Sequence, residues 1–208
     1  MVLRFGPEII AALESVDTEV DGNMKLEMEY EIYGKLVEPS ELEKADRKEQ
    51  QEQWGIPVNR TEKNAGDGNI RVRCYNDGER YILTSKVKSS KGNFEVELES
   101  TADQFKQFKM LADTGLKKTR YYFDIPDSNM VYEVDVFTVA GGEQSPWVKI
   151  DLEVPKGFNI DDLPDLPLQL DSIRVIAPGR KKDEDRAFVS ELFETFNLPN
   201  EYLSDITA

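Results

Sequence analysis

The sequence predicts a mainly antiparallel β fold of the α+β class, with a few helices at its periphery. Several segments alternate apolar and charged residues with the period of two that is typical of a strand. Short turn-like sequences join some of these segments directly, which indicates hairpins and therefore antiparallel pairing. The remaining helix-like segments are few and lie between or after the strands, so we expect them to pack around the sheet.

The expected strands share this alternation and cover residues 24–36, 70–75, 80–88, 93–100, 116–125, 130–139 and 147–155. The tripeptide Asn76-Asp77-Gly78 is a strong turn signal, because these residues tolerate the backbone of a tight hairpin turn. It predicts that 70–75 and 80–88 pair with each other. We expect a second hairpin to join 116–125 with 130–139.

Helices are expected at 7–16, where Pro7 stands near the start, at 101–115 and at 184–199. Thr101 is the predicted N-cap of the middle helix and Gly115 its predicted C-cap. The segment 161–170 is interrupted by prolines and is expected to pack over a surface.

We expect one domain spanning residues 1–208, with a core at about 24–170 and a C-terminal helical segment at 183–208. Residues 37–69 change in composition to a strongly charged, helix-prone stretch followed by a loop-like one. We interpret 37–69 as a charged insertion, made of a surface helix and a mobile loop, that could cap one end of a site.

Composition excludes several classes of function. The 208 residues include no histidine and one cysteine, Cys74, so histidine-based catalysis, disulfides and thiolate zinc sites are excluded. The net charge of −15 argues against DNA as a partner. No apolar run approaches a membrane span and no secretory signal is evident, so a cytoplasmic location is expected without a membrane partner. A homodimer is left open.

Each expected strand carries charged residues on one face, often of one sign. These residues are Glu27, Glu29, Glu31, Arg71, Arg73, Lys86, Lys88, Glu95, Glu97, Glu99, Lys118, Arg120, Glu133, Asp135, Lys149, Asp151 and Glu153. Two interpretations are open: an open sheet with its charged face in water, or a closed barrel with that face inside. A charged interior suits a charged ligand, because guanidinium and ammonium groups grip phosphate while carboxylates hold Mg²⁺ or Mn²⁺.

The segments "IRVR", "RYILTSK", "FEVELE", "KTRYYF", "YEVDVF" and "KIDLEVP" occur in an order that resembles the CYTH family, the triphosphate tunnel metalloenzymes. The resemblance covers roughly residues 24–170. It implies an eight-stranded antiparallel tunnel with a charged interior, covered by peripheral helices, that binds a triphosphate together with a divalent metal. The family includes inorganic triphosphatases, thiamine triphosphatase and class IV adenylate cyclases.

The resemblance also implies roles for individual residues. The expected phosphate-binding residues are Arg71, Arg73, Lys86, Lys88, Lys118 and Arg120. The expected metal ligands are Glu27, Glu29, Asp151 and Glu153, and the expected catalytic residues are Glu31, Glu97 and Asp135.

The first strand departs from the family signature Glu-x-Glu-x-Lys. Read from Glu27 the signature ends at Glu31, and read from Glu29 it ends at Tyr33, so neither reading supplies the lysine.

The expected function is hydrolysis of inorganic triphosphate, a nucleoside triphosphate or thiamine triphosphate, with Mg²⁺ or Mn²⁺ as cofactor and a small-molecule triphosphate as partner. The alternatives are an adenylate cyclase of the same fold, an RNA 5′-triphosphatase, and a non-catalytic binder of a nucleotide or polyphosphate.

Overall fold

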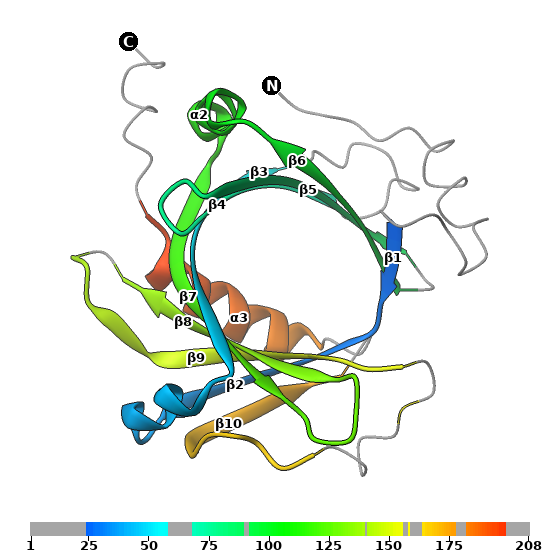
Figure 1. The fold of residues 1–208 in the computed structure, drawn as a ribbon, viewed down its shortest axis with the longest axis vertical. Helices are drawn as coiled ribbons and strands as arrows, with labels where there is room; N and C mark the ends of the chain where they lie inside the picture. The colour runs from blue at the N-terminus through cyan, green and yellow to red at the C-terminus, as the bar shows by residue number, and fades with distance from the viewer. Residues whose placement is uncertain are drawn as a thin grey trace. The chain divides into compact units, whose positions relative to one another are not determined.

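A computed structural model describes residues 24–57, 68–89, 92–139, 141–155, 158, 164–177 and 182–198 (Figure 1). These residues divide into two compact units. The first unit contains the described residues of 24–27, 51–116 and 198, and the second contains those of 28–50 and 117–197. The helix expected at 7–16 falls on residues that the structure does not describe.

Neither of the α-helices in the described ranges is long and apolar enough to cross a membrane.

The first unit is built on antiparallel strands. In order of pairing they are β1 (Met24–Glu27), β6 (Gly92–Ser100), β5 (Arg80–Ser89), β4 (Gly68–Tyr75) and β3 (Arg47–Pro57), with residues 47–50 of β3 belonging to the second unit. The predicted hairpin of β4 and β5 is confirmed. Asn76, Asp77 and Gly78 in its turn have φ angles of 46°, 55° and 114°, which is the left-handed backbone that these residue types tolerate best.

Helix α2 (Ala102–Leu111) packs against β4 and β5 in the first unit. Thr101 is its N-cap, as predicted, and forms a capping box with Gln104. The expectation that Gly115 ends this helix is wrong, because the C-cap is Ala112 and Gly115 lies in strand β7 (Thr114–Asp124). The ring of Trp54 lies so close to Gly115 that an added side chain would overlap it. Gly115 is therefore explained by close packing.

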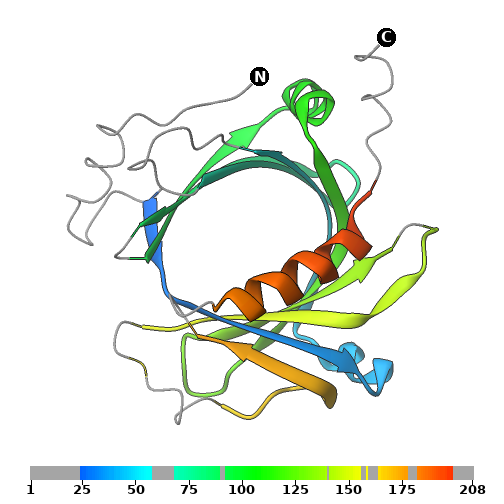
Figure 2. The ribbon, with the colours of Figure 1, turned by 180° about the vertical axis from the view of Figure 1, so that it is seen from behind.

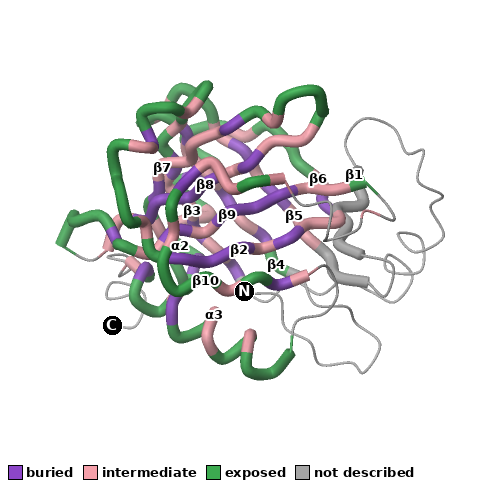
Figure 3. Tube along the Cα trace, turned by 90° about the horizontal axis from the view of Figure 1, so that it is seen from below, coloured by how far each residue is buried: buried purple, intermediate pink, exposed green. Residues whose placement is uncertain are grey.

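The second unit pairs its strands in the order β7, β8 (Val131–Thr138), β9 (Gln144–Glu153), β2 (Glu29–Leu36) and β10 (Leu170–Ile176), all antiparallel, with residues 114–116 of β7 in the first unit. The hairpin predicted from 116–125 and 130–139 is confirmed as β7 and β8. One face of this sheet forms an apolar core that includes Ile32, Val134 and Ile150. Figure 3 shows buried positions repeating along β2 and β9.

Helix α3 (Asp183–Phe196) confirms the predicted C-terminal helix and lies across β8 and β9 (Figure 2). Phe188 of α3 meets Tyr33 and Trp147 edge to face, and Phe196 stacks on Phe137 with ring centroids 4.2 Å apart. These three strand residues are at odd-numbered positions, on the face opposite the apolar core. The helix therefore covers part of the face that also carries charged residues.

The charged segment after residue 37 differs from its expected structure. The surface helix expected in the charged segment after residue 37 is wrong. Only the short 3₁₀ helix η1 (Pro39–Lys44) forms there, and β3 begins at Arg47. The loop expected after β3 falls mostly at 58–67, outside the described residues.

The expected first strand is divided at Met28, so β1 pairs with β6 while β2 pairs with β9 and β10. Strand β10 was not expected, and its pairing is interrupted by a bulge that includes Ser172, with a φ of 57°. The described residues thus form ten strands rather than the eight expected, and no pairing among them joins β10 to β1. Closure into a tunnel stays a prediction.

Candidate functional site

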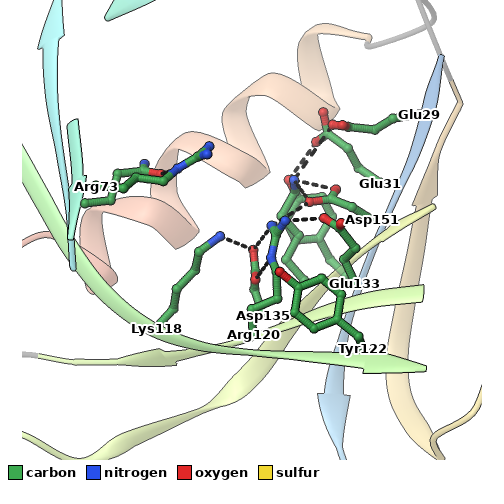
Figure 4. A network of polar contacts seen from close by, with 12 residues as sticks. Glu29, Glu31, Arg73, Lys118, Arg120, Tyr122, Glu133, Asp135 and Asp151 are labelled. Carbon is green, nitrogen blue, oxygen red and sulfur yellow. Dashed lines mark hydrogen bonds and ion pairs between the residues drawn. The ribbon is translucent and has the colours of Figure 1, made fainter. Parts of the chain in front are cut away.

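The charged face of the second unit consists of residues that stand opposite one another on neighbouring strands. One row across β7, β8, β9 and β2 is Arg120, Asp135, Lys149 and Tyr33. The adjacent row is Tyr122, Glu133, Asp151 and Glu31. Because side chains alternate between the faces of a strand, both rows lie on one side of the sheet. Figure 4 shows most of these side chains converging.

Asp135 of β8 is the most enclosed charge of this face, with 1% of its surface exposed. It accepts hydrogen bonds from Arg120 Nε at 2.6 Å and Nη2 at 2.8 Å, and from Lys118 Nζ at 2.5 Å. Burial alone would raise the pKa of Asp135, but the attraction of Arg120 and Lys118 lowers that pKa well below its usual range. Asp135 is therefore held ionised between two cations.

Arg120 is the hub of the same network. Besides Asp135 it contacts Glu133, and its Nη2 lies 3.5 Å from Asp151 Oδ2. Burial opposes the charged form of Arg120, but the carboxylates around it raise its pKa well above the ordinary value. The pKa of Glu133 is raised because its burial outweighs the attraction to Arg120. The guanidinium is thus fixed, while Glu133 binds a proton more readily than an exposed carboxylate does.

Lys149 of β9 lies among further carboxylates. Its Nζ is 2.5 Å and 2.7 Å from the two oxygens of Asp151 and 3.9 Å from Glu29 Oε1. Burial opposes the charge of Lys149, but Asp151 and Glu29 raise its pKa well above the ordinary value. In the β2–β9 ladder Lys149 is the partner of Tyr33, the residue at which the second reading of the first-strand signature lacks its lysine.

Two tyrosines anchor carboxylates at the edges of this network. Tyr33 donates a hydrogen bond of 2.7 Å to Glu31 Oε2, and Tyr122 donates one to Glu49 of β3. Burial raises the pKa of both phenols, so both remain protonated donors. Hydrogen bonding from Tyr33 holds Glu31 on the charged face.

The first unit has its own charged cluster, centred on Glu95 of β6. Glu95 lies 3.0 Å from Arg71, 3.3 Å from Lys86 and 4.0 Å from Arg73, and only 8% of its surface is exposed. Strands β4, β5 and β6 place these residues together because Lys86 is the ladder partner of Glu95 and the two arginines alternate along β4. Cations thus outnumber the carboxylate at the centre of this cluster.

Arg73 is held by several partners at once. It donates hydrogen bonds of 3.0 Å to Gln53 and 3.1 Å to Glu97. Thr84, fully buried, donates to the same oxygen of Glu97 at 3.2 Å. The Glu97 side chain is nevertheless 51% exposed. The Arg73 guanidinium is therefore oriented by Gln53 of the neighbouring strand β3 and by Glu97 of β6.

The predicted site residues fall into two groups. Those in the first unit are Arg71, Arg73, Lys86 and Glu97, and those in the second are Glu29, Glu31, Lys118, Arg120, Asp135, Asp151 and Glu153. Glu27 lies in β1 and Lys88 in β5, but their side chains lie outside the described residues. The structure brings each group together within its own unit, and the functional roles remain predictions.

The sequence-based selection missed three central residues. Glu95, Glu133 and Lys149 lie on the same alternating faces as the selected residues, which is the signal that could have found them. Only the contacts distinguish them from their neighbours, because alternation gives the face of a residue and not its partners. Tyr33 and Tyr122 were missed because tyrosines on a strand are usually read as packing residues.

The carboxylates of β2 and β9 have the donor chemistry that Mg²⁺ or Mn²⁺ requires. Glu29 is the ladder partner of Glu153, and Glu31 is the partner of Asp151. Within the described ranges, however, no group of three or more acidic or thiol side chains is already gathered closely enough to hold a metal ion. The carboxylates are therefore of a type that can bind a metal. In the present arrangement, however, Lys149 pairs with Glu29 and Asp151, and Tyr33 donates a hydrogen bond to Glu31.

Comparisons with known proteins add solved structures but no sequence match: no family model and no curated protein matches the chain. One similar solved structure is a candidate adenylyl cyclase from Hippeastrum, which is described as having a dominant triphosphatase activity. It is 16% identical in sequence to this chain, and the alignment covers 62% of this chain and 80% of that chain at a TM-score of 0.43. A conserved hypothetical protein from Pyrococcus furiosus is 19% identical to this chain. The alignment covers 85% of this chain and 98% of that chain at a TM-score of 0.43.

A candidate adenylate cyclase from Bacillus halodurans is 12% identical, with 86% of this chain and 96% of that chain covered, at a TM-score of 0.42. Identity and TM-score at this level carry no argument about the function of this chain. The resemblance to the CYTH family therefore rests on the segments of the sequence, and the functional argument rests on the residues of the two charged faces.

Proposed function

We propose that this protein is a triphosphate hydrolase that uses a divalent metal, Mg²⁺ or Mn²⁺. The observation that carries the proposal is that the charged side chains at alternating strand positions are buried in ion-pair networks. Lys118, Asp135 and Asp151 are each less than 10% exposed. A sheet whose charged face simply meets water would leave such residues solvated. Their burial supports a face built to hold a charged ligand.

The energetic cost of this burial strengthens the proposal. Taking ions out of water costs several kcal/mol per ion, by an order-of-magnitude estimate, and their mutual attraction often fails to offset it. Replacing a buried ion-pair network by well-packed apolar residues often leaves a protein equally stable or more stable. A functional need for these charges is the better explanation of their burial.

The basic residues of the first unit suit the phosphate groups of the substrate. Arg71 and Lys86 lie 3.0 Å and 3.3 Å from Glu95, and Arg73 lies 4.0 Å from it, so three cations gather at one position on this face. Guanidinium groups bind phosphate oxygens with two hydrogen bonds, and the contacts that orient Arg73 reduce the entropy lost on binding. In the proposal these residues bind phosphate oxygens.

The acidic residues of the second unit suit the metal. Glu29, Asp151 and Glu153 would hold it, and when bound it would supply Lewis-acid stabilisation of phosphate oxygens. Asp135 keeps Arg120 and Lys118 in position, and these two cations stabilise negative charge on the transferred phosphoryl group. Glu31, oriented by Tyr33, would accept the proton of the attacking water. The closed tunnel that the resemblance implies stays a prediction, and each face is a subsite in its own right.

The proposal is tested by incubating the protein with Mg²⁺ or Mn²⁺ and inorganic triphosphate, ATP or thiamine triphosphate. Orthophosphate, pyrophosphate and cyclic AMP are then measured separately. Release of orthophosphate supports hydrolysis, while pyrophosphate with cyclic AMP identifies a cyclase instead. Binding without any product supports a non-catalytic binder, the alternative favoured by the absence of the signature lysine, whose place is taken by Glu31 or Tyr33. Absence of both binding and turnover across the panel would overturn the assignment.

A further inference from the structure

A pocket of the second unit contains none of the predicted site residues. Its walls come from η1, the turn that follows it, the start of β3, and strands β7 and β9, and its volume is about 610 Å³. The residues that line it include Leu42, Glu43, Asp46, Arg47, Lys48 and Tyr121. This volume is typical of a binding site for a small organic molecule.

The walls of this pocket are fixed by contacts with the rest of the second unit. Leu42 of η1 is buried in the apolar core, and Tyr121 of β7 packs against the same core. The backbone N–H of Asp46 donates to the Tyr122 carbonyl at 2.9 Å, and the Asp46 carboxylate accepts from the Asp124 N–H at 2.9 Å. A ligand therefore meets a wall that is in place before it binds, which lowers the entropy cost of binding.

The two cations of the pocket are accessible to a ligand. The Arg47 guanidinium lies over the Tyr122 ring, 4.1 Å from its centroid, and both Arg47 and Lys48 are exposed. Neither side chain makes a hydrogen bond or an ion pair with the residues that the structure describes. The pocket thus combines an apolar wall at Leu42 and Tyr121 with two cations that can pair with an anionic group.

The carboxylates of the pocket limit which anion can bind. Glu43 and Asp46 oppose Arg47 and Lys48, so the four formal charges cancel. A polyanion such as triphosphate would gain little from a lining without net charge. A molecule with one negative charge can pair with a cation and use its apolar part for the rest of its binding energy.

We propose that this pocket binds a small organic monoanion, a molecule with an apolar body and a single carboxylate or sulfonate group. The apolar body lies against Leu42 and Tyr121, and the anionic group pairs with Lys48 and Arg47. The site is separate from the residues assigned to triphosphate hydrolysis, so it does not rest on that function.

The test is a fluorescence titration of the full chain with 8-anilinonaphthalene-1-sulfonate, a monoanionic aromatic dye whose emission rises in apolar surroundings. We expect saturable binding, weakened about tenfold by Lys48→Gln because a charge-assisted hydrogen bond is lost. Lys44→Gln is the matched control, because Lys44 is a neighbouring lysine that pairs with Glu41 and does not line the pocket. The uncharged analogue N-phenyl-1-naphthylamine should bind wild type and Lys48→Gln equally.

No saturable binding of the dye by the wild type, or equal weakening by Lys48→Gln and Lys44→Gln, would overturn the inference. Inorganic triphosphate should leave the dye bound, and displacement by triphosphate would contradict the inference by placing the dye at the phosphate-binding residues instead. Lys48 is exposed, so Lys48→Gln is expected to fold, and urea unfolding checks this. None of these measurements involves turnover, so their outcome and that of the hydrolysis assay are independent.

Discussion

Arg120 of β7 and Asp135 of β8 are ladder partners joined by two hydrogen bonds, from Nε at 2.6 Å and from Nη2 at 2.8 Å. The fork of the guanidinium matches the two carboxylate oxygens, and Asp135 is almost completely shielded from water. The pair links two strands and positions the two cations that the proposed chemistry requires.

Asp135→Asn should destabilise the protein by about 3–5 kcal/mol, because it leaves Arg120 and Lys118 buried without a full counter-charge. The free energy of unfolding is measured by urea denaturation. Glu97→Gln is the control, since its partly exposed pair with Arg73 should cost about 1 kcal/mol or less. Similar small losses in the two variants would show that the buried network contributes little to stability.

The stability of the protein should decrease at acidic pH because of Asp135. The pKa of Asp135 is lower in the folded state than the value of about 3.9 for an unfolded chain. The contribution of Asp135 is therefore fully present above that value and is lost as pH falls through its folded pKa. Urea unfolding between about pH 5 and about pH 3 should show a shallower decline for Asp135→Asn than for the wild type.

Glu133 should have the opposite effect to Asp135 on how stability depends on pH. Its pKa is raised by burial in the folded state, so the native protein binds this proton more strongly than the unfolded chain does. Glu133 therefore favours folding most below its unfolded pKa of about 4.3, and that contribution is lost as pH rises through the folded pKa. Glu133→Gln should remove this component, seen as a smaller drop in stability over that interval. An identical pH profile in wild type and variant would contradict the assignment.

Arg73→Gln should weaken the binding of inorganic triphosphate by about tenfold or more, because a charge-assisted hydrogen bond contributes about 1.5–3 kcal/mol. The dissociation constant is measured by calorimetry at fixed ionic strength. Lys106→Gln removes one positive charge from an exposed position of α2, in the same unit, and should change the affinity little. Equal weakening by both substitutions would point to the overall charge of the protein rather than to a site at Arg73.

Gly115→Ala should destabilise the protein by about 1–3 kcal/mol, because the new methyl group would overlap the buried ring of Trp54. Trp54→Phe removes the part of the ring that would be hit, so the double variant should lose less than the sum of the two single variants. Thermal or urea unfolding of all four proteins gives the coupling energy. Simple additivity would mean that the two residues do not touch in solution.

Local features of the chain were predictable from the sequence wherever neighbouring residues decide the structure. The turn at 76–78 and the N-cap at Thr101 were predicted correctly, because both depend on a few adjacent residues. The segment 47–57 was misread as helical, because its many Glu, Gln and Lys residues favour helices. Pairing with β4 and burial of Trp54 and Ile56 override that propensity.

Alternation by itself determined which residues of this protein share a face, including nearly every charged residue of the candidate site. Only the tertiary structure decided that Asp135 and Lys118 are buried, that Glu95 is a centre of one network, and that Lys149 stands between Asp151 and Glu29. The physical reason is that a period of two is a property of one strand, whereas burial, register and ion pairing depend on strands that are distant in the sequence.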